Sequence, residues 1–220
     1  MERTPEPELM DEAGQARAYA QADFEEVNAA FVEAFRQAFP RLGDSPFLLD
    51  LGCGPGDIPL RLARAFPGAL VEALDGSQAM IDLARETLAG TEEAGRIRLV
   101  TSTVQDLEPP ARPYSAVVSN SLLHHLHQPG VLWQAIKRVA GKGTAVYLMD
   151  LQRPDSAEQA ADLVARYAED EPEQLRSDFY NSLLAAFTPD EVRNQLSQAG
   201  LVGLAVEGVS DRHLLVRGTL

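Results

Sequence analysis

Short apolar runs alternate along the chain with stretches in which apolar residues recur every three or four positions. The runs predict buried strands, and the periodic stretches predict amphipathic helices. Strands are expected at residues 47–51, 70–74, 97–101, 116–119 and 144–149. Their alternation with helical stretches predicts an α/β fold in which helices cover both faces of a parallel sheet.

The pattern changes after residue 150. Residues 151–187 carry two helical stretches with no strand between them, which predicts a helical lid inserted over the site. The last two strands are expected at 201–206 and 213–216. The residues that link them, 207–212, are too few to form a crossover helix. These two strands should therefore pair antiparallel. The complete prediction is a three-layer sandwich with a mainly parallel seven-stranded sheet, its last strand antiparallel, plus helical lid elements.

Residues 1–44 are expected to form an N-terminal helical cap. The acidic, proline-containing stretch 1–14 predicts a frayed tail, and the helical spacing of apolar residues predicts one helix over 15–39. In the simpler interpretation, this helix packs on the edge of the domain. In the alternative, it is a lid that turns Tyr19 and Asp23 toward the site.

Composition narrows the class of protein. At 220 residues with 45% hydrophobic content, the chain predicts a single globular domain over 1–220. The net charge of −14 with scattered Lys and Arg argues against nucleic-acid and membrane partners. The N-terminus lacks the basic start and apolar core of a signal peptide, so a cytoplasmic location is expected. Cys53 is the only cysteine, which excludes an intrachain disulfide and a cysteine-based metal cluster.

The stretch most informative about chemistry follows the first strand, where Gly52, Gly54 and Gly56 lead into a helical pattern. Glycine has no Cβ, so a ligand can lie directly against this backbone. The free N–H groups of the helix start favour an anionic group such as a carboxylate. Asp75 ends the second strand, where an acid in an open α/β sheet can accept hydrogen bonds from ribose hydroxyls. The alternative is that Asp75 only caps the next helix and binds no ligand.

A nicotinamide dinucleotide is the competing cofactor for such a loop. Its fingerprint requires a third glycine three positions after the second. Counting from Gly54, that position is Asp57, so the match fails.

The sequence Leu-Asp-Leu-Gly-Cys-Gly-Pro-Gly at 49–56 resembles the cofactor loop of the class I S-adenosylmethionine (SAM)-dependent methyltransferases. The acid at Asp75, the segment 118–126 and the closing antiparallel strands are similar to that family as well. The resemblance covers 45–150 clearly and implies a Rossmann-like methyltransferase that converts SAM to S-adenosylhomocysteine (SAH).

The resemblance also implies which residues contact the cofactor. Asp50 would orient the loop or meet the SAM amino group, and Asp75 would hold the ribose. Family members often carry an acid that binds the adenine amino group, but Thr103 occupies the corresponding position here. The adenine contact therefore stays open between Thr103, the Val104 backbone and Asp106. The full implied set is Asp50, Gly52, Cys53, Gly54, Gly56, Asp75, Gly76, Met80, Thr103, Val104, Asp106 and Asn120.

Three places could supply contacts to the methyl acceptor. A histidine after the fourth strand could act as a base near its usual pKa of about 6.5, with His125 first among His124, His125 and His127. Tyr180 lies in a polar triplet within an otherwise apolar helix. Tyr19 lies on the N-terminal helix. Packing or capping is the simpler role for each, and no metal site is expected because no further ligand cluster accompanies the histidines.

The predicted function is SAM-dependent methyl transfer to a small-molecule nucleophile under the helical lid. A non-catalytic SAM-binding or protein-interaction module, or methylation of a protein substrate, is the alternative. Because the helices at 151–187 could serve a dimer as well as a lid, a homodimer also stays open.

Overall fold

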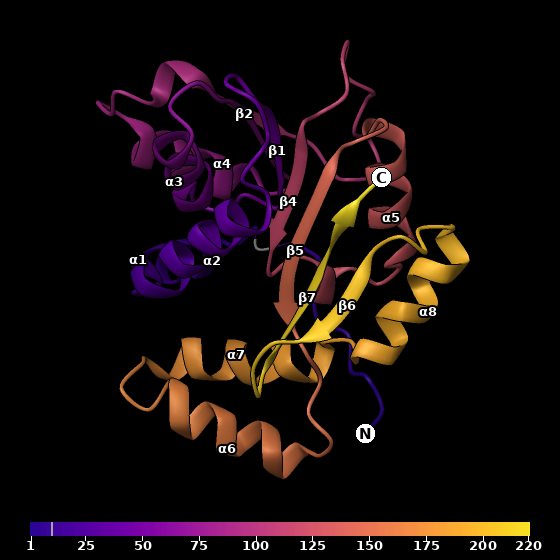
Figure 1. The fold of residues 1–220 in the computed structure, drawn as a ribbon. Helices are drawn as coiled ribbons and strands as arrows, with labels where there is room; N and C mark the ends of the chain where they lie inside the picture. Colours follow the sequence, from indigo (N-terminus) through magenta and orange to yellow (C-terminus); the bar gives the residue numbers. More distant parts are fainter. Residues whose placement is uncertain (10) are drawn as a thin grey trace.

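The computed structural model describes residues 1–9 and 11–220, and its centre is one seven-stranded sheet in the order β3-β2-β1-β4-β5-β7-β6 (Figure 1). β1 to β5 run parallel, so their carboxyl ends meet at the edge of the sheet that faces α7 in Figure 1. The strands are β1 (Phe47–Leu51), β2 (Leu70–Asp75), β3 (Ile97–Thr101), β4 (Ala116–Asn120), β5 (Ala145–Leu151), β6 (Ala205–Gly208) and β7 (His213–Thr219).

β7 is the antiparallel strand of the sheet. It pairs antiparallel with β5 on one side and with β6 on the other. The predicted seven-stranded α/β fold with an antiparallel last strand is therefore confirmed. β6 begins later than expected, because Leu201 and Leu204 precede the strand and are buried in the core beside α8.

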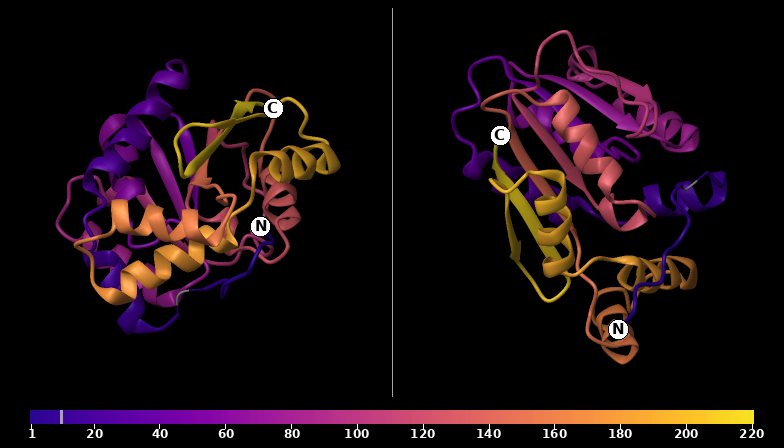
Figure 2. Two further views of the ribbon diagram at one scale, coloured as in Figure 1. Left: turned by 90° about the horizontal axis from the view of Figure 1, so that it is seen from below. Right: turned by 90° about the vertical axis from the view of Figure 1, so that its right-hand side faces the viewer.

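Helices cover both faces of the sheet (Figures 1 and 2). Trp133 and Ile136 of α5 join α8 in one apolar core, and Phe31 and Phe35 of α2 join α3 in the core of the opposite face. The helices of the sandwich are α2 (Glu25–Ala38), α3 (Asp57–Ala65), α4 (Gln78–Leu88), α5 (Gly130–Val139) and α8 (Pro189–Ala199), with short 3-10 turns η1 (Ala94–Arg96) and η2 (Leu123–His125). None of the described helices is long and apolar enough to cross a bilayer.

The single helix predicted over 15–39 is wrong. The structure has α1 (Ala13–Gln21) and α2, separated by a break at Ala22, whose backbone is extended. The Asp23 side chain accepts a hydrogen bond from the Glu25 N–H at 3.0 Å. A short aspartate side chain that bonds to a nearby backbone N–H favours a helix start over a helix interior. The spacing of apolar residues does not reveal this break, because it does not depend on such a hydrogen bond.

The prediction of a frayed tail is wrong for residues 1–9, and Met10 lies outside the described residues. Arg3 donates hydrogen bonds to the Ala185 and His124 carbonyls at 2.5 and 2.7 Å, and its guanidinium lies 4.0 Å above the Phe187 ring. The Thr4 N–H donates to the Leu184 carbonyl at 3.0 Å. We call residues 1–9 the N-terminal strap, since they run across the carboxyl ends of the strands beside α7 (Figure 2).

The inserted region forms two helices, α6 (Ala157–Tyr167) and α7 (Glu173–Ala185), which pack on each other through a small apolar cluster. They lie beyond the carboxyl ends of the strands, and Figure 2 shows them from below. α7 contacts η2. Two helices therefore lie within 151–187, while the prediction that they are an inserted lid stays a prediction.

Candidate functional site

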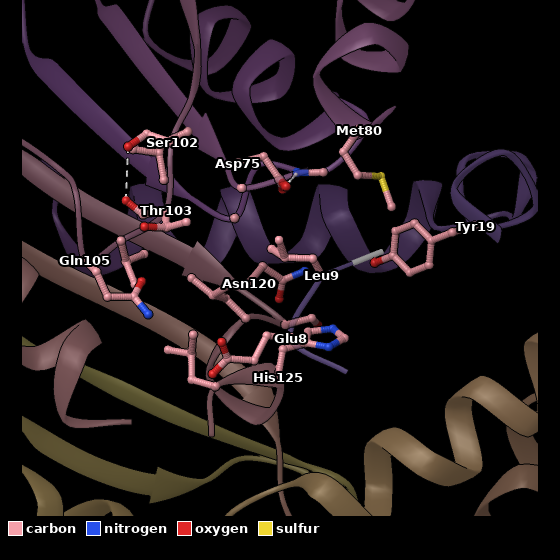
Figure 3. A pocket seen from close by; sticks show the side chains of 18 residues that line it. Glu8, Leu9, Tyr19, Asp75, Met80, Ser102, Thr103, Gln105, Asn120 and His125 are labelled. Carbon is pink, nitrogen blue, oxygen red and sulfur yellow. Dashed lines mark hydrogen bonds between the residues drawn. The ribbon is translucent and has the colours of Figure 1, made fainter. Parts of the chain in front are cut away.

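A cavity opens at the carboxyl ends of β1, β2 and β4 (Figure 3). Asp75 and Met80 lie on one side, His125 and Glu8 lie opposite, and Tyr19 closes a third side. A second hollow on the other side of the glycine loop shares Tyr19, Gly52, Gly54 and Asn120 with the first. The first cavity is lined by Glu8, Leu9, Tyr19, Gly52, Gly54, Leu74, Asp75, Gly76, Met80, Ser102, Thr103, Val104, Gln105, Asn120, Ser121, Leu122, His125 and Leu126.

The three loop glycines share a backbone conformation that favours glycine, but their surroundings differ. All have positive φ, at 74° for Gly52, 51° for Gly54 and 89° for Gly56. A Cβ on Gly56 would lie 3.0 Å from the Ala84 Cβ, so this glycine lets α3 and α4 approach. A Cβ on Gly54 would meet nothing within 4 Å, and Gly54 lines both hollows. Gly54 is therefore where a ligand can lie against the backbone.

Asp75 ties the glycine loop to the end of β2. Its carboxylate accepts hydrogen bonds from the Gly54 N–H at 2.9 Å and from the Ser77 N–H at 2.8 Å. Burial raises the pKa of Asp75, while these two N–H groups act in the opposite direction. Each carboxylate oxygen keeps a further lone pair. The side chain lines the cavity and can accept a pair of neighbouring hydroxyl groups there.

Two buried oxygen atoms beside the loop have no hydrogen-bond partner in the part of the chain that the structure describes. Asp50 is only 1% exposed, and its Oδ2 has no hydrogen-bond partner among the described residues. The Asn120 Oδ1 is in the same situation. Burial, and after it the charge of Asp75, raises the pKa of Asp50 to about 8. Buried acceptors without a donor are costly, and the ammonium group of an amino-acid cofactor would satisfy them.

The residues predicted around the ribose and the adenine divide into two groups. Gly76, predicted beside the ribose, and Met80, Thr103 and Val104, predicted near the adenine, line the cavity. Asp106 is outside the lining, and its carboxylate accepts a hydrogen bond from the Thr103 hydroxyl at 2.7 Å.

Three more residues of the predicted set do not line the first cavity. Cys53 is buried and lines only the second hollow, and Gly56 lines neither hollow. Asp50 also lines neither hollow, because it is buried behind the loop in β1.

His125 faces the cavity opposite Asp75, and Tyr19 faces it from a third side (Figure 3). Burial, and after it the neighbouring His124, lowers the pKa of His125 to about 3, far below the ordinary value expected from the sequence. Burial, with Asp75 and Asp150 next, raises the pKa of Tyr19 to about 12. Near neutral pH, His125 is therefore a neutral imidazole and Tyr19 a protonated phenol.

Tyr180 does not join them. Its ring packs against the apolar cluster between α6 and α7, and the residue lies outside both linings. Asp23, which the sequence placed beside Tyr19, lines only the second hollow.

Sequence reasoning missed the contribution of the N-terminal strap. Glu8 and Leu9 line the cavity, and Glu6 lies 3.3 Å from the His125 Nδ1. Nothing in an acidic stretch at a chain end indicates where it will pack. It also missed Ser121, a lining residue with φ of 58°; a serine with positive φ costs energy and is found at functional sites.

Comparison with known proteins is consistent with this geometry. A family model described as "Methyltransferase domain" matches residues 48–143. Trans-aconitate 2-methyltransferase of Mycobacterium tuberculosis is 40% identical over 79 residues, which cover 35% of this chain and 26% of the relative. The match thus spans about a quarter of the length of that curated relative.

Solved structures extend the likeness to nearly the whole chain. A SAM-dependent methyltransferase from Aquifex aeolicus has a TM-score of 0.63 and 16% identity, covering 93% of this chain and 97% of its own. The plantazolicin methyltransferase BpumL, in complex with SAH, has a TM-score of 0.68 and 12% identity, with 94% and 90% covered. Residues 48–143 therefore match the methyltransferase family, and the chain as a whole has the fold of the SAM-dependent methyltransferases. The predicted resemblance, fold and cofactor are thereby confirmed, while the residues of this chain that contact SAM stay predictions.

Proposed function

We propose that this methyltransferase transfers the SAM methyl group to a small-molecule nucleophile that lies between Tyr19, Asn120 and His125. One observation carries the proposal: a single cavity joins the backbone of Gly54 and the carboxylate of Asp75 to these three side chains. In this assignment the cofactor lies on the glycine side and the acceptor lies on the side of η2 and the strap.

The residues on the glycine side suit the parts of SAM. Asp75 would accept the ribose hydroxyls, Asp50 and Asn120 would accept the ammonium group, and Met80 would contact the adenine. Bound SAM would supply an activated methyl group: the nucleophile bonds to the methyl carbon in line with the breaking carbon–sulfur bond, and SAH leaves. Because positioning supplies much of the acceleration in such a step, the walls of the acceptor side matter more than any single acid or base.

Tyr19 and His125 would act as orienting groups. A phenol that stays protonated can donate a hydrogen bond to the acceptor, and the neutral His125 ring offers an uncharged wall beside it. The low pKa of His125, about 3, makes its ring a poor proton acceptor at neutral pH. The arrangement therefore favours an acceptor that reaches the site with its lone pair already free.

The charges around the site argue against a tricarboxylate such as trans-aconitate. The carboxylates of Glu8 and Asp75 line the first cavity. In the second hollow, the Arg61 Nε donates to Asp57 at 2.7 Å, so this cation is already paired. An anion with three charges would be repelled by these walls, and a neutral or cationic acceptor is favoured.

The experiment is to incubate the full chain with methyl-labelled SAM and a metabolite extract, and then to identify labelled products by mass spectrometry. Trans-aconitate is tested separately as a pure compound. We expect a labelled neutral or cationic product, and no transfer to trans-aconitate above a reaction without protein.

The matched control is Asp75→Ala, which should remove the labelled product by removing cofactor binding. If the wild-type protein binds SAM tightly but labels no compound in any extract, the proposal of a small-molecule acceptor fails. Rapid methylation of trans-aconitate would contradict the charge argument and leave the cofactor assignment intact.

A further inference from the structure

Three side chains converge under the strap, and two of them, Glu6 and His124, have no part in the proposed reaction. Glu6 comes from the strap, and His124 and His125 come from η2 after β4. One ligand atom from each, the Glu6 carboxylate oxygen, the His124 Nε2 and the His125 Nδ1, lies within 4.8 Å of the other two. His124 is only 3% exposed, so this is an interior cluster rather than a patch of surface acids.

The hydrogen bonds around the cluster direct free lone pairs into its centre. The His124 Nδ1 lies 2.6 Å from the Asp150 carboxylate, so this nitrogen donates and Nε2 carries a lone pair in the neutral ring. The His125 Nδ1 is buried without a hydrogen-bond partner among the described residues, although the Glu6 Oε1 lies 3.3 Å away. The ring forms a hydrogen bond with the Pro7 backbone. In the neutral tautomer that donates this bond from Nε2, the Nδ1 lone pair faces the Glu6 carboxylate, and the two repel unless a positive charge lies between them.

The spacing fits a tetrahedral metal ion. Glu6 Oε1 lies 3.5 Å from His124 Nε2 and 3.3 Å from His125 Nδ1. In a tetrahedron with ligand bonds of ~2.0–2.1 Å, neighbouring ligand atoms are about 3.3–3.4 Å apart. These two distances match the tetrahedral spacing, and the third, between the two histidine ligand atoms, is within 4.8 Å.

The surroundings of the ligands are also those of a metal site. A metal-bound imidazole commonly donates its other N–H to a carboxylate, which fixes the ring, and Asp150 occupies that position for His124. The Ser182 hydroxyl of α7 donates to the Glu6 carboxylate at 3.0 Å and orients it. Asp150 also accepts from the Leu123 N–H at 2.6 Å, which holds η2 against the end of β5.

We propose that Glu6, His124 and His125 bind one divalent cation of zinc's class. Glu6 belongs to the strap and the two histidines belong to η2, so the ion joins the strap to the end of the sheet. Glu8 and Leu9 of the same strap line the cavity. Metal binding would therefore hold these two residues over the site. The fourth coordination position would be left to water or to a group of the acceptor.

A proton on His124 is the competing occupant of the same space. Burial lowers the pKa of His124, but Asp150 and Glu6 outweigh that effect and raise it. Other charged groups also act on the cluster, because Arg3 lies near His124 and Asp178 of α7 lies near Glu6. A metal must displace this proton, so metal affinity should fall as the pH is lowered.

The test uses the tag-free full chain, stripped of metal with a chelator and titrated with Co²⁺. Zinc is then added to displace the cobalt. We expect one equivalent of Co²⁺ per chain with the intense visible bands of tetrahedral cobalt, and their loss on addition of Zn²⁺. Glu6→Gln and His125→Asn should each weaken binding by more than the ~10–100-fold that loss of an outer partner causes.

Glu2→Gln is the matched control, because it makes the same change on an exposed strap residue and should leave cobalt affinity unchanged. Trypsin supplies a second measurement by cutting after Arg3, and Zn²⁺ should slow that cut in the wild type but not in Glu6→Gln. Absence of the visible bands, or equal bands in Glu6→Gln, would overturn the proposal and assign the cluster to a proton on His124. Neither measurement depends on methyl transfer.

Discussion

The two sides of the cavity are built by different means. On the glycine side, the site is made mainly of backbone at Gly52 and Gly54 and of one carboxylate that ends a strand, Asp75. On the acceptor side, it is made of side chains from the strap and α1 and from η2, which begins about a hundred residues after α1 ends. Backbone sites depend on local sequence, whereas side-chain sites depend on how distant segments pack. A substitution should therefore act on one side and spare the other.

The largest effect is expected for Asp75→Ala. The variant loses the acceptor of two ribose hydroxyls and loosens the loop through Gly54 and Ser77. Each hydrogen bond to a charged group contributes about 1.5–3 kcal/mol, so SAM affinity should fall by ~100-fold or more. Isothermal titration calorimetry measures the dissociation constant of SAM, with Asp82→Ala on the exposed part of α4 as the control. Equal affinities in the two variants would contradict the assignment of the glycine side.

The same contrast explains how much of the fold and site could be predicted from sequence. Phe47–Leu51, the glycine loop and Asp75 follow one another within 30 residues, so periodicity and residue type sufficed to place them. The strap could not be placed, because the partners of Glu6 and Arg3 lie more than 100 residues away. The break at Ala22 was missed because one aspartate side chain decided it. Tyr180 has a suitable residue type, but packing turns it toward α6.

Asp50 should make cofactor affinity depend on pH. Burial and the neighbouring Asp75 raise its pKa to about 8, so below that pH the folded protein without SAM holds a proton there. The SAM ammonium group requires the carboxylate, and binding must expel the proton. Affinity should therefore fall up to ~10-fold for each pH unit below 8, within the range where SAM keeps its own charge. Calorimetry at pH 6, 7 and 8 measures the slope.

Asp50→Asn is the control for that slope. The variant should bind SAM more weakly and lose the pH dependence assigned to this group. A carboxyl pKa raised by folding lowers stability as the pH rises from its unfolded value through its folded value, so Asp50→Asn should also raise the Tm of the SAM-free protein at pH 8. A pH slope that survives in Asp50→Asn would show that another group carries the coupling.

Gly54→Ala should have a smaller effect, confined to the glycine side. Its methyl group would project into open space on the cavity wall rather than into the protein. We expect SAM affinity to fall by about 10-fold, the equivalent of ~1.4 kcal/mol. Gly143→Ala is the matched control, because Gly143 also has positive φ and open space but lies outside both linings. If both variants lose only stability and both keep full affinity, the cofactor does not lie against Gly54.

The smallest effect is expected for Tyr19→Phe. Loss of one hydrogen bond to the acceptor contributes about 0.5–1.5 kcal/mol, so kcat should fall ~2–10-fold while SAM affinity is unchanged. Tyr180→Phe is the control, since that ring packs between α6 and α7. Both variants are compared by steady-state kinetics, using the acceptor identified from the labelled extract. A slower Tyr180→Phe with an unaffected Tyr19→Phe would reverse the assignment of the acceptor side.

A crystal structure of the full chain with SAH tests the division of the cavity most directly. The account predicts the ribose on Asp75, the ammonium group near Asp50 and Asn120, and the sulfur directed toward Tyr19 and His125. SAH bound with its ribose away from Asp75, or with its sulfur directed away from His125, would contradict it.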